Sequence, residues 1–212
     1  VTPDGERSMN TYLGACVELG PEHVEADVVA QAKVTYFEGY LWDPPRAKEA
    51  ILACARIAHE NGREMSMTLS DSFCVGRYRD EFLDLMRSGT VDIVFANRDE
   101  ALSLYETDDF DLALTKIAAD CKLAAVTMSE DGAMIVRGSE RIHVSATTIN
   151  QLVDTTGAGD LFAAGFLYGY TQDRSLEDCG KLGCLAAGIV IQQIGPRPMS
   201  SLSDAAKAAG LI

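Results

Sequence analysis

Segments typical of β-strands alternate with segments typical of α-helices along most of this chain, and the alternation limits the folds open to it. Strand-like residues span 34–41, 64–70, 91–96 and 123–128, with helix-like residues between them. Parallel strands need long crossover connections, which helices usually supply, so the pattern predicts a parallel sheet with helices on both faces. We expect an α/β fold, namely a three-layer sandwich with a mostly parallel sheet.

The other predicted elements follow from capping residues, turn residues and hydrophobic spacing. They are helices over 21–33, 44–61, 76–88, 98–105, 110–120, 159–170, 176–193 and 202–209, a hairpin of 133–136 with 141–144, and a strand over 7–13. No low-complexity linker or internal repeat interrupts them, which predicts a single domain over 1–212.

Composition argues against several classes of partner. The net charge of −14 disfavours nucleic acid and anionic membranes, because both need clustered Lys and Arg. No apolar run approaches the length of a membrane span, so we expect no membrane partner. The six cysteines show no CxxC and no zinc-type spacing, which predicts reduced thiols in a cytoplasm. The three histidines are scattered along the chain, which argues against a His-based metal site.

Residues 154–160, Asp-Thr-Thr-Gly-Ala-Gly-Asp, precede a largely apolar segment over 161–168. Two glycines one residue apart allow a tight turn and a close approach of the backbone to a ligand. A helix that begins there adds unpaired N–H groups and the positive end of its dipole, which favours a phosphoryl group. A carboxylate at Asp160 would then lie beside the anion, where it could deprotonate an attacking hydroxyl. The alternative is a tight turn with an aspartate at a helix start.

The same seven residues closely resemble the C-terminal signature of the ribokinase/PfkB family of carbohydrate and nucleoside kinases. The resemblance implies a ribokinase-like, Rossmann-like fold, with ATP and Mg²⁺ as cofactors. It also implies that Gly157, Ala158 and Gly159 form the anion hole for the transferred phosphate and that Asp160 is the catalytic base. Thr156 becomes a candidate for nucleotide binding. By the same resemblance, residues 1–14 and 34–41 become candidate lid or substrate-side strands.

Asn97 and Glu100 follow the strand over 91–96. An amide and a carboxylate three residues apart at a helix start lie on one face, and Mg²⁺ prefers oxygen ligands. The same spacing also fits an N-terminal capping box. The pair resembles the family's Asn-x-x-Glu motif, which implies that Asn97 and Glu100 help to place Mg²⁺ and the nucleotide phosphates. Asp99 lies outside that motif and is expected to face solvent.

Residues 126–132 resemble the family turn that contacts the ATP phosphates. That turn typically has a Thr, a Gly two residues later and then a second Gly. Thr127 and Gly132 match it, and Ser129 stands at the usual first glycine, where it still offers a hydroxyl and an N–H. The alternative is a simple strand-to-hairpin turn, which a Glu-Asp-Gly run makes by itself.

The segment from Cys184 to Val190 presents a helix face of small residues. Tight helix packing explains such a run in general, whereas the family resemblance implies that this helix borders the adenine pocket. Cys184 stands where Asn or His is common in related kinases. The loop over 195–198 resembles the family segment that can bind a monovalent cation, which implies a K⁺ site.

The substrate prediction rests on the residues after the strand that ends at Ser70. Ribokinase-type sugar kinases usually carry Asp-x-Asn-x-Arg there, whereas this chain has Asp71, Ser72 and Phe73. That is more similar to adenosine kinases. Among sugars and nucleosides, adenosine is therefore the best single substrate, with AMP as the product.

The resemblance covers almost the whole chain but only the C-terminal part of the family's fold. The family's first strands, its Gly-Gly motif and the Asp and Asn residues that hold substrate hydroxyls have no counterpart here. A second hypothesis is therefore a truncated, non-catalytic nucleotide-binding or oligomerisation module. A sheet without its first strands would expose an edge, which predicts a homodimer. A Rossmann dehydrogenase is disfavoured, because no GxGxxG opens a first βαβ unit. A Walker-type NTPase is disfavoured, because GxxxxGK[ST] does not occur in the sequence.

Overall fold

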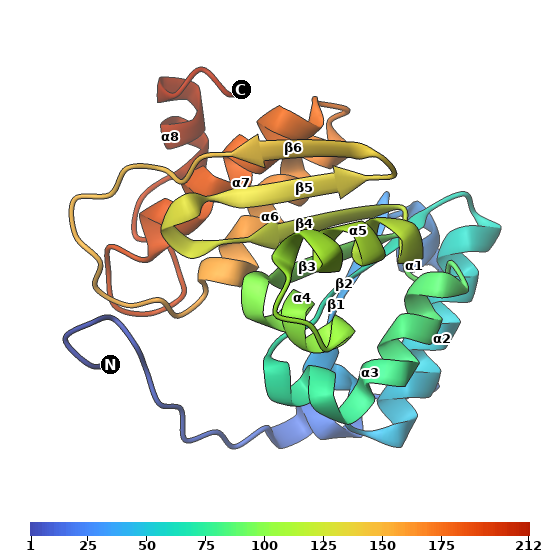
Figure 1. Ribbon diagram of the computed structural model, residues 1–212. Helices are drawn as coiled ribbons and strands as arrows, with labels where there is room; N and C mark the ends of the chain where they lie inside the picture. Colours follow the sequence, from blue (N-terminus) through green and yellow to red (C-terminus); the bar gives the residue numbers. More distant parts are fainter. The chain divides into compact units, whose positions relative to one another are not determined.

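The computed structural model describes residues 1–212 and contains six strands (Figure 1). They are β1 (Val34–Glu38), β2 (Glu64–Thr68), β3 (Ile93–Asn97), β4 (Leu123–Thr127), β5 (Ala133–Arg137) and β6 (Glu140–Val144). They form one sheet in the order β1-β2-β3-β4-β5-β6. The pairs β1–β2 and β2–β3 are parallel, and β5 and β6 run in opposite directions across a tight turn. The predicted α/β class with a mostly parallel sheet is confirmed.

Eight α-helices and four 3₁₀-helices complete the secondary structure. They are α1 (Ala26–Gln31), α2 (Pro45–Glu60), α3 (Ser72–Arg87), α4 (Arg98–Tyr105), α5 (Phe110–Asp120), α6 (Ala158–Thr171), α7 (Leu176–Val190), α8 (Leu202–Ala208), η1 (Gly14–Glu18), η2 (Pro21–His23), η3 (Gly39–Trp42) and η4 (Ser129–Asp131). None of these helices combines the length and the apolar character that a membrane-spanning helix needs. All six cysteines are free.

The chain divides into two compact units. The C-terminal unit comprises residues 1–11, 127–135 and 141–212. The central unit comprises residues 12–126 and 136–140. A single domain over the whole chain stays a prediction.

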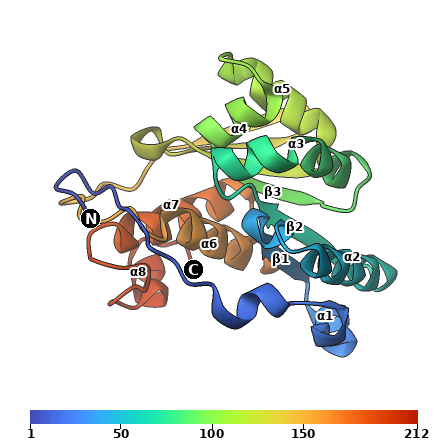
Figure 2. The same ribbon diagram turned by 90° about the horizontal axis from the view of Figure 1, so that it is seen from below.

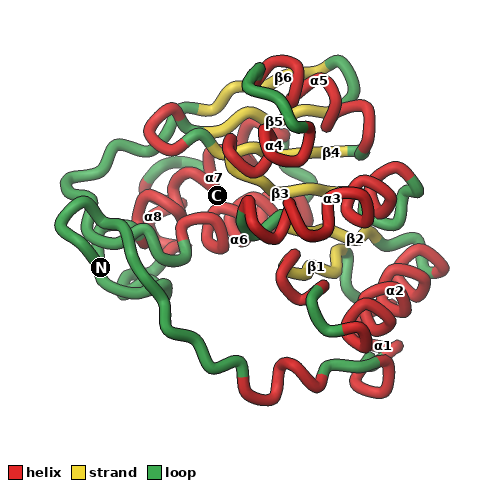
Figure 3. Tube along the Cα trace, turned by 60° about the horizontal axis from the view of Figure 1, so that its bottom comes forward, coloured by secondary structure: helices red, strands yellow, loops and turns green.

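In the central unit, the strands β1, β2 and β3 lie side by side (Figure 3). Side chains of β2 and β3 such as Met65, Met67 and Ile93 are fully buried, as expected for parallel strands with continuous apolar runs. Because these strands are parallel, their carboxyl ends at Glu38, Thr68 and Asn97 meet at one edge of the sheet. That edge is where α/β folds bind ligands.

In the C-terminal unit, helices α6 and α7 lie side by side (Figure 2). A Cβ atom placed on Gly165 would lie 2.4 Å from the carbonyl oxygen of Leu182, and one on Gly183 would lie 2.9 Å from the ring of Phe162. Glycine lets the two backbones approach this closely. Tight helix packing therefore accounts for glycines on both helices, including Gly183 next to Cys184.

Two predicted elements are wrong. Residues 7–13 form no strand, because a strand needs a hydrogen-bonded neighbour and no strand of the sheet pairs with this segment, whose residues are all exposed. The candidate lid strand over 1–14 is therefore absent. The helix predicted over 21–33 is broken into η2 and α1, because the backbone is extended at Val24 and Glu25.

The strand predicted over 34–41 is shorter than expected. It ends at Glu38, and Gly39 begins η3. A Cβ atom on Gly39 would lie 2.8 Å from the carbonyl oxygen of Thr68, so the chain turns here across the end of β2.

Candidate functional site

The turn before α6 takes a shape that glycine makes possible. Gly157 is the N-cap of α6 and has a φ of 81°, in the left-handed region. A Cβ atom there would also lie 2.7 Å from the Cβ of Pro196. Any other side chain would strain both the backbone and this contact, so the sequence requires glycine at this position.

Unpaired amides gather at the start of α6. The N–H groups of Gly157, Gly159 and Asp160 donate to no carbonyl, whereas that of Ala158 donates to the Thr155 carbonyl oxygen over 3.1 Å. The space beside Gly159 is open, since no atom lies within 4 Å of a Cβ placed there. Free N–H groups at the positive end of a helix dipole suit an anion. The amide of Ala158 is already engaged, so the available donors are those on either side of it.

Asp160 is the third residue of α6, and its carboxylate is exposed. It forms no hydrogen bond or ion pair within the chain. It therefore lies next to the unpaired amides with its oxygens free to accept a proton. This arrangement brings together four of the predicted residues: Gly157, Ala158, Gly159 and Asp160.

Asp154 is buried in the same turn, with 2% of its surface exposed. One carboxylate oxygen accepts hydrogen bonds from the N–H and the hydroxyl of Thr156, and the other accepts one from the N–H of Gly195 over 2.8 Å. The hydroxyl of Thr156, the N–H of Gly195 and the N–H of Thr156 lower the pKa of Asp154 to about 2. Sequence reasoning assigned no role to this residue. The Asp-Thr-Thr spacing of an Asx turn was the available signal.

The side chain of Gln193 bridges the loop over 193–199. Gln193 donates from its amide nitrogen to the carbonyl oxygen of Arg197 and accepts from the N–H of Met199 over 2.9 Å. Gly195 has a φ of 88° in the middle of this loop. Residues 195–198, the loop predicted to bind a monovalent cation, lie against the turn over 154–160. Pro196 contacts Gly157, and the N–H of Gly195 donates to Asp154.

Asn97 and Glu100, in the central unit, form the capping box that the spacing allowed. Asn97 Oδ1 accepts from the N–H of Glu100 over 2.8 Å, and the Glu100 carboxylate accepts from the N–H and the Nδ2 of Asn97 over 2.9 and 2.8 Å. Glu100 is 5% exposed, and its burial raises its pKa to about 7, helped by the charges of Asp71, Asp99 and Glu38. Asp99 is exposed, as expected.

These contacts limit how magnesium could be held. No group of three or more His, Cys, Asp or Glu side chains could hold a metal ion directly. Each oxygen of Glu100 accepts one hydrogen bond from Asn97 and keeps a second lone pair. The pair therefore fits a hydrated Mg²⁺ held through water molecules.

The turn after β4 closes on itself. The N–H of Met128 donates to the carbonyl oxygen of Gly132 over 2.7 Å. A Cβ atom on Gly132 would lie 2.0 Å from the carbonyl oxygen of Val144. Ser129 has a φ of 53°, the left-handed region in which glycine is most at ease. The strand-to-hairpin turn is formed, and its backbone at Ser129 is the kind that the expected glycine would adopt. The roles of Thr127, Ser129 and Gly132 in nucleotide binding stay predictions.

Cys184 is a buried residue of α7, with 7% of its surface exposed. Burial raises the pKa of its thiol to about 11, so the side chain is neutral at physiological pH. A contact of Cys184 with adenine stays a prediction.

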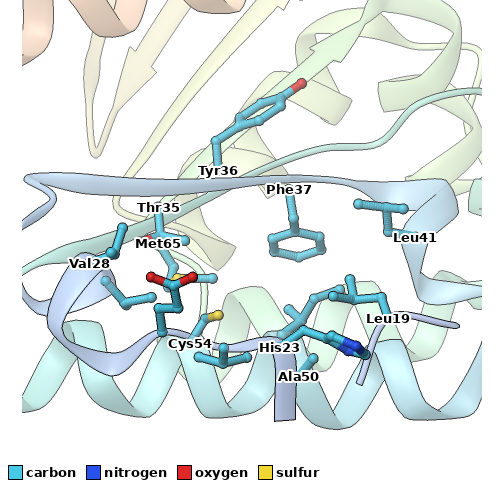
Figure 4. A pocket seen from close by; sticks show the side chains of 14 residues that line it. Leu19, His23, Val28, Thr35, Tyr36, Phe37, Leu41, Ala50, Cys54 and Met65 are labelled. Carbon is cyan, nitrogen blue, oxygen red and sulfur yellow. The ribbon is translucent and has the colours of Figure 1, made fainter. Parts of the chain in front are cut away.

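A separate cavity of about 410 Å³ lies in the central unit between β1 and α2 (Figure 4). Thr35 and Phe37 of β1 point towards α2, and Tyr36 points to the opposite face. The other lining residues include Leu41, Cys54 and Met65. None of the predicted site residues lines this cavity.

Comparison with known proteins relates this chain to a family of kinases. The family model for pfkB family carbohydrate kinases matches residues 1–202. The adenosine kinase of Saccharomyces cerevisiae (strain ATCC 204508 / S288c) is 29% identical over 205 residues, which cover 90% of this chain and 59% of that relative. The chain thus spans about three fifths of the length of this curated relative.

Two solved structures match along the whole chain. A probable sugar kinase protein from Rhizobium etli CFN 42 is 84% identical with a TM-score of 0.99, covering 100% of this chain and 64% of that one. The adenosine kinase from Sinorhizobium meliloti is 76% identical with a TM-score of 0.97, covering 99% of this chain and 64% of that one. These similarities confirm the predicted ribokinase-like fold.

Proposed function

Because this chain belongs to the pfkB family of carbohydrate kinases, we propose that it serves ATP-dependent transfer of a phosphoryl group to a hydroxyl of a sugar or nucleoside. The best single substrate is adenosine, which would give AMP. Two similar proteins, from Sinorhizobium meliloti and Saccharomyces cerevisiae, are named adenosine kinases, which supports a nucleoside.

One observation carries the proposal, namely an exposed carboxylate beside unpaired amides. Asp160 would accept the proton of the substrate hydroxyl as the oxygen attacks the γ-phosphorus of ATP. The amides of Gly157 and Gly159 would stabilise the negative charge on the transferred group. One side chain would thus take up the proton, and the backbone of the same turn would bind the transferred group.

The remaining site residues are proposed to hold the cofactors. Asn97 and Glu100 would hold water molecules of Mg²⁺, which neutralises charge on the ATP phosphates when it is bound. The proposed nucleotide contacts are Thr127, Ser129, Gly132, Thr156 and Cys184.

A potassium ion is proposed near the loop over 193–199. The observation that supports it is the buried carboxylate of Asp154, which lies between the turn over 154–160 and this loop and stays ionised, because its hydrogen bonds lower its pKa to about 2. An ionised carboxylate in such a position favours a neighbouring cation. Carbonyl groups of the turn and of the loop would complete such a site.

The substitution Asp160→Asn tests the proposed base. The amide keeps the size of the side chain but cannot take up the proton, so turnover of adenosine with MgATP should fall by roughly 10²- to 10⁴-fold. Nucleotide affinity, measured by calorimetry, should stay within about threefold.

Two outcomes separate the hypotheses. Equal turnover in the variant would remove Asp160 from the chemistry. If the unaltered chain binds MgATP but makes no phosphorylated product from adenosine or from a panel of sugars, the non-catalytic nucleotide-binding module is favoured instead.

A further inference from the structure

The cavity between β1 and α2 is enclosed by several elements of the central unit (Figure 4). Its walls come from β1, β2, α2 and the segment over 19–29, which includes η2 and the start of α1. Phe37, Ala50 and Met65 line it, and each is at most 5% exposed, so this wall lies inside the protein. We propose that the cavity binds a small, uncharged, largely apolar molecule that carries one hydrogen-bonding group.

The segment over 19–29 is fastened to its neighbours near both ends. Glu22 forms an ion pair with Arg46 of α2. Arg63 Nε donates to the carbonyl oxygen of Ala30, just beyond the segment, over 3.1 Å. The residues at the break between η2 and α1 line the cavity. This wall is therefore held by side chains that lie outside the cavity.

The cavity has room for a ligand because α2 presents small side chains to it. Ala50 and Cys54 of α2 both line the cavity and lie one helical turn apart. An apolar cavity of about 150 Å³ already binds benzene, and ligand pockets start at about 300 Å³. At about 410 Å³, this cavity has space for a molecule of two fused rings.

One buried hydroxyl in the central unit has no partner and points into this region. Thr35 Oγ1 is buried and forms no hydrogen bond. The side chain of Thr35 lines the cavity and points from β1 towards α2 (Figure 4). An unpaired buried hydroxyl costs free energy, and a water molecule is held well only by two or more polar partners. A ligand with one polar group would satisfy the hydroxyl and fill the apolar space together.

The charges around the cavity narrow the class of ligand. No Lys or Arg lines it, whereas Glu25 does. The chain as a whole carries a net charge of −14, so an anion would be repelled. The walls formed by side chains such as Phe37 and Met65 are apolar, and burying any charge against them is costly. An uncharged molecule is therefore favoured.

The probe is 2-naphthol, and naphthalene is the matched compound without the hydroxyl. Titration of the whole 212-residue chain should show saturable binding of 2-naphthol. The substitution Thr35→Val keeps the shape of the side chain but removes its hydroxyl. It should weaken 2-naphthol by roughly two- to tenfold, while the affinity for naphthalene should not fall. The control Thr115→Val, which alters an exposed threonine of α5, should bind both compounds as the unaltered chain does.

Two further measurements place the probe in the cavity. Ala50→Leu fills part of the space, so it should abolish binding of both compounds. N-ethylmaleimide modifies free thiols, and Cys54 is a free, half-buried thiol on the cavity wall. Bound 2-naphthol should slow the modification of Cys54 several fold. Cys16 is exposed and lies outside the cavity, so its modification should be unaffected.

Absence of saturable 2-naphthol binding would overturn the proposal, as would equal affinity in Thr35→Val or modification of Cys54 at an unchanged rate. A dimer of the unaltered chain that Ala50→Leu dissociates, measured by sedimentation, would show that another copy fills the cavity and would equally overturn it. If Ala50→Leu does not fold, Cys54→Met fills the same space and should weaken both compounds, with Cys16→Met as its control. Equal affinity in Cys54→Met would contradict the proposal. Kinase activity plays no part in these measurements, so they are independent of the proposed function.

Discussion

At the scale of single residues, the buried carboxyl of Glu100 has a consequence for stability. Burial is the largest cause that raises its pKa from 4.5 to about 7. Between these two values the folded chain keeps a proton that the unfolded chain has lost. The free energy of unfolding therefore falls as pH rises from about 4.5 to about 7. Above pH 7 the effect of Glu100 on the free energy of unfolding no longer changes with pH.

The substitution Glu100→Gln should remove this part of the pH dependence. Glutamine keeps an acceptor for the N–H of Asn97, so the capping box is retained. We expect the drop in unfolding free energy between pH 5 and pH 8, measured by urea denaturation, to be smaller in the variant by on the order of 1–3 kcal/mol. An identical drop in both proteins would show that Glu100 titrates normally.

At the scale of elements, the close approach of α6 and α7 depends on the absence of side chains at their contact. The Cβ of an alanine at position 165 would lie 2.4 Å from the Leu182 carbonyl oxygen, which belongs to the backbone and cannot rotate away. Gly165→Ala should therefore force the helices apart and lower the unfolding free energy by about 1–3 kcal/mol. Urea denaturation measures the change.

The matched control is Gly76→Ala in α3. Nothing lies within 4 Å of a Cβ placed there, so only the higher helix propensity of alanine should act. We expect the free energy of unfolding to rise by roughly 0.5–1 kcal/mol. A rise of the same size in Gly165→Ala would mean that α6 and α7 can move apart without loss of stability.

The ends of elements were predictable where a side chain caps a helix. Helices α4 and α5 begin and end at the expected residues, and each is capped by a side chain that accepts from an N–H in the first turn, Asn97 in one and Asp109 in the other. Capping depends on neighbours three residues away, so the sequence contains it. The strand expected over 7–13 failed because strand formation depends on a partner elsewhere in the chain.

At the scale of the whole molecule, the net charge of −14 repels itself in the folded state. Added salt screens that repulsion, so the melting temperature should rise with ionic strength. If K⁺ also binds beside Asp154, KCl should raise the melting temperature more than NaCl at the same ionic strength, and more than it does in Asp154→Asn. Equal curves for the two salts in the unaltered chain would remove the potassium proposal.

The alternation of strands and helices, and the residues that resemble a kinase signature, could be read from the sequence alone. Both depend on near neighbours along the chain, through backbone periodicity and short motifs. Tertiary structure decided which amides near Gly157 are free, that Glu100 is buried, and that Asp154 meets Gly195. Those facts depend on residues that packing brings together, such as Asp154 and Gly195, which are 41 positions apart in the sequence, and no local pattern encodes such a contact.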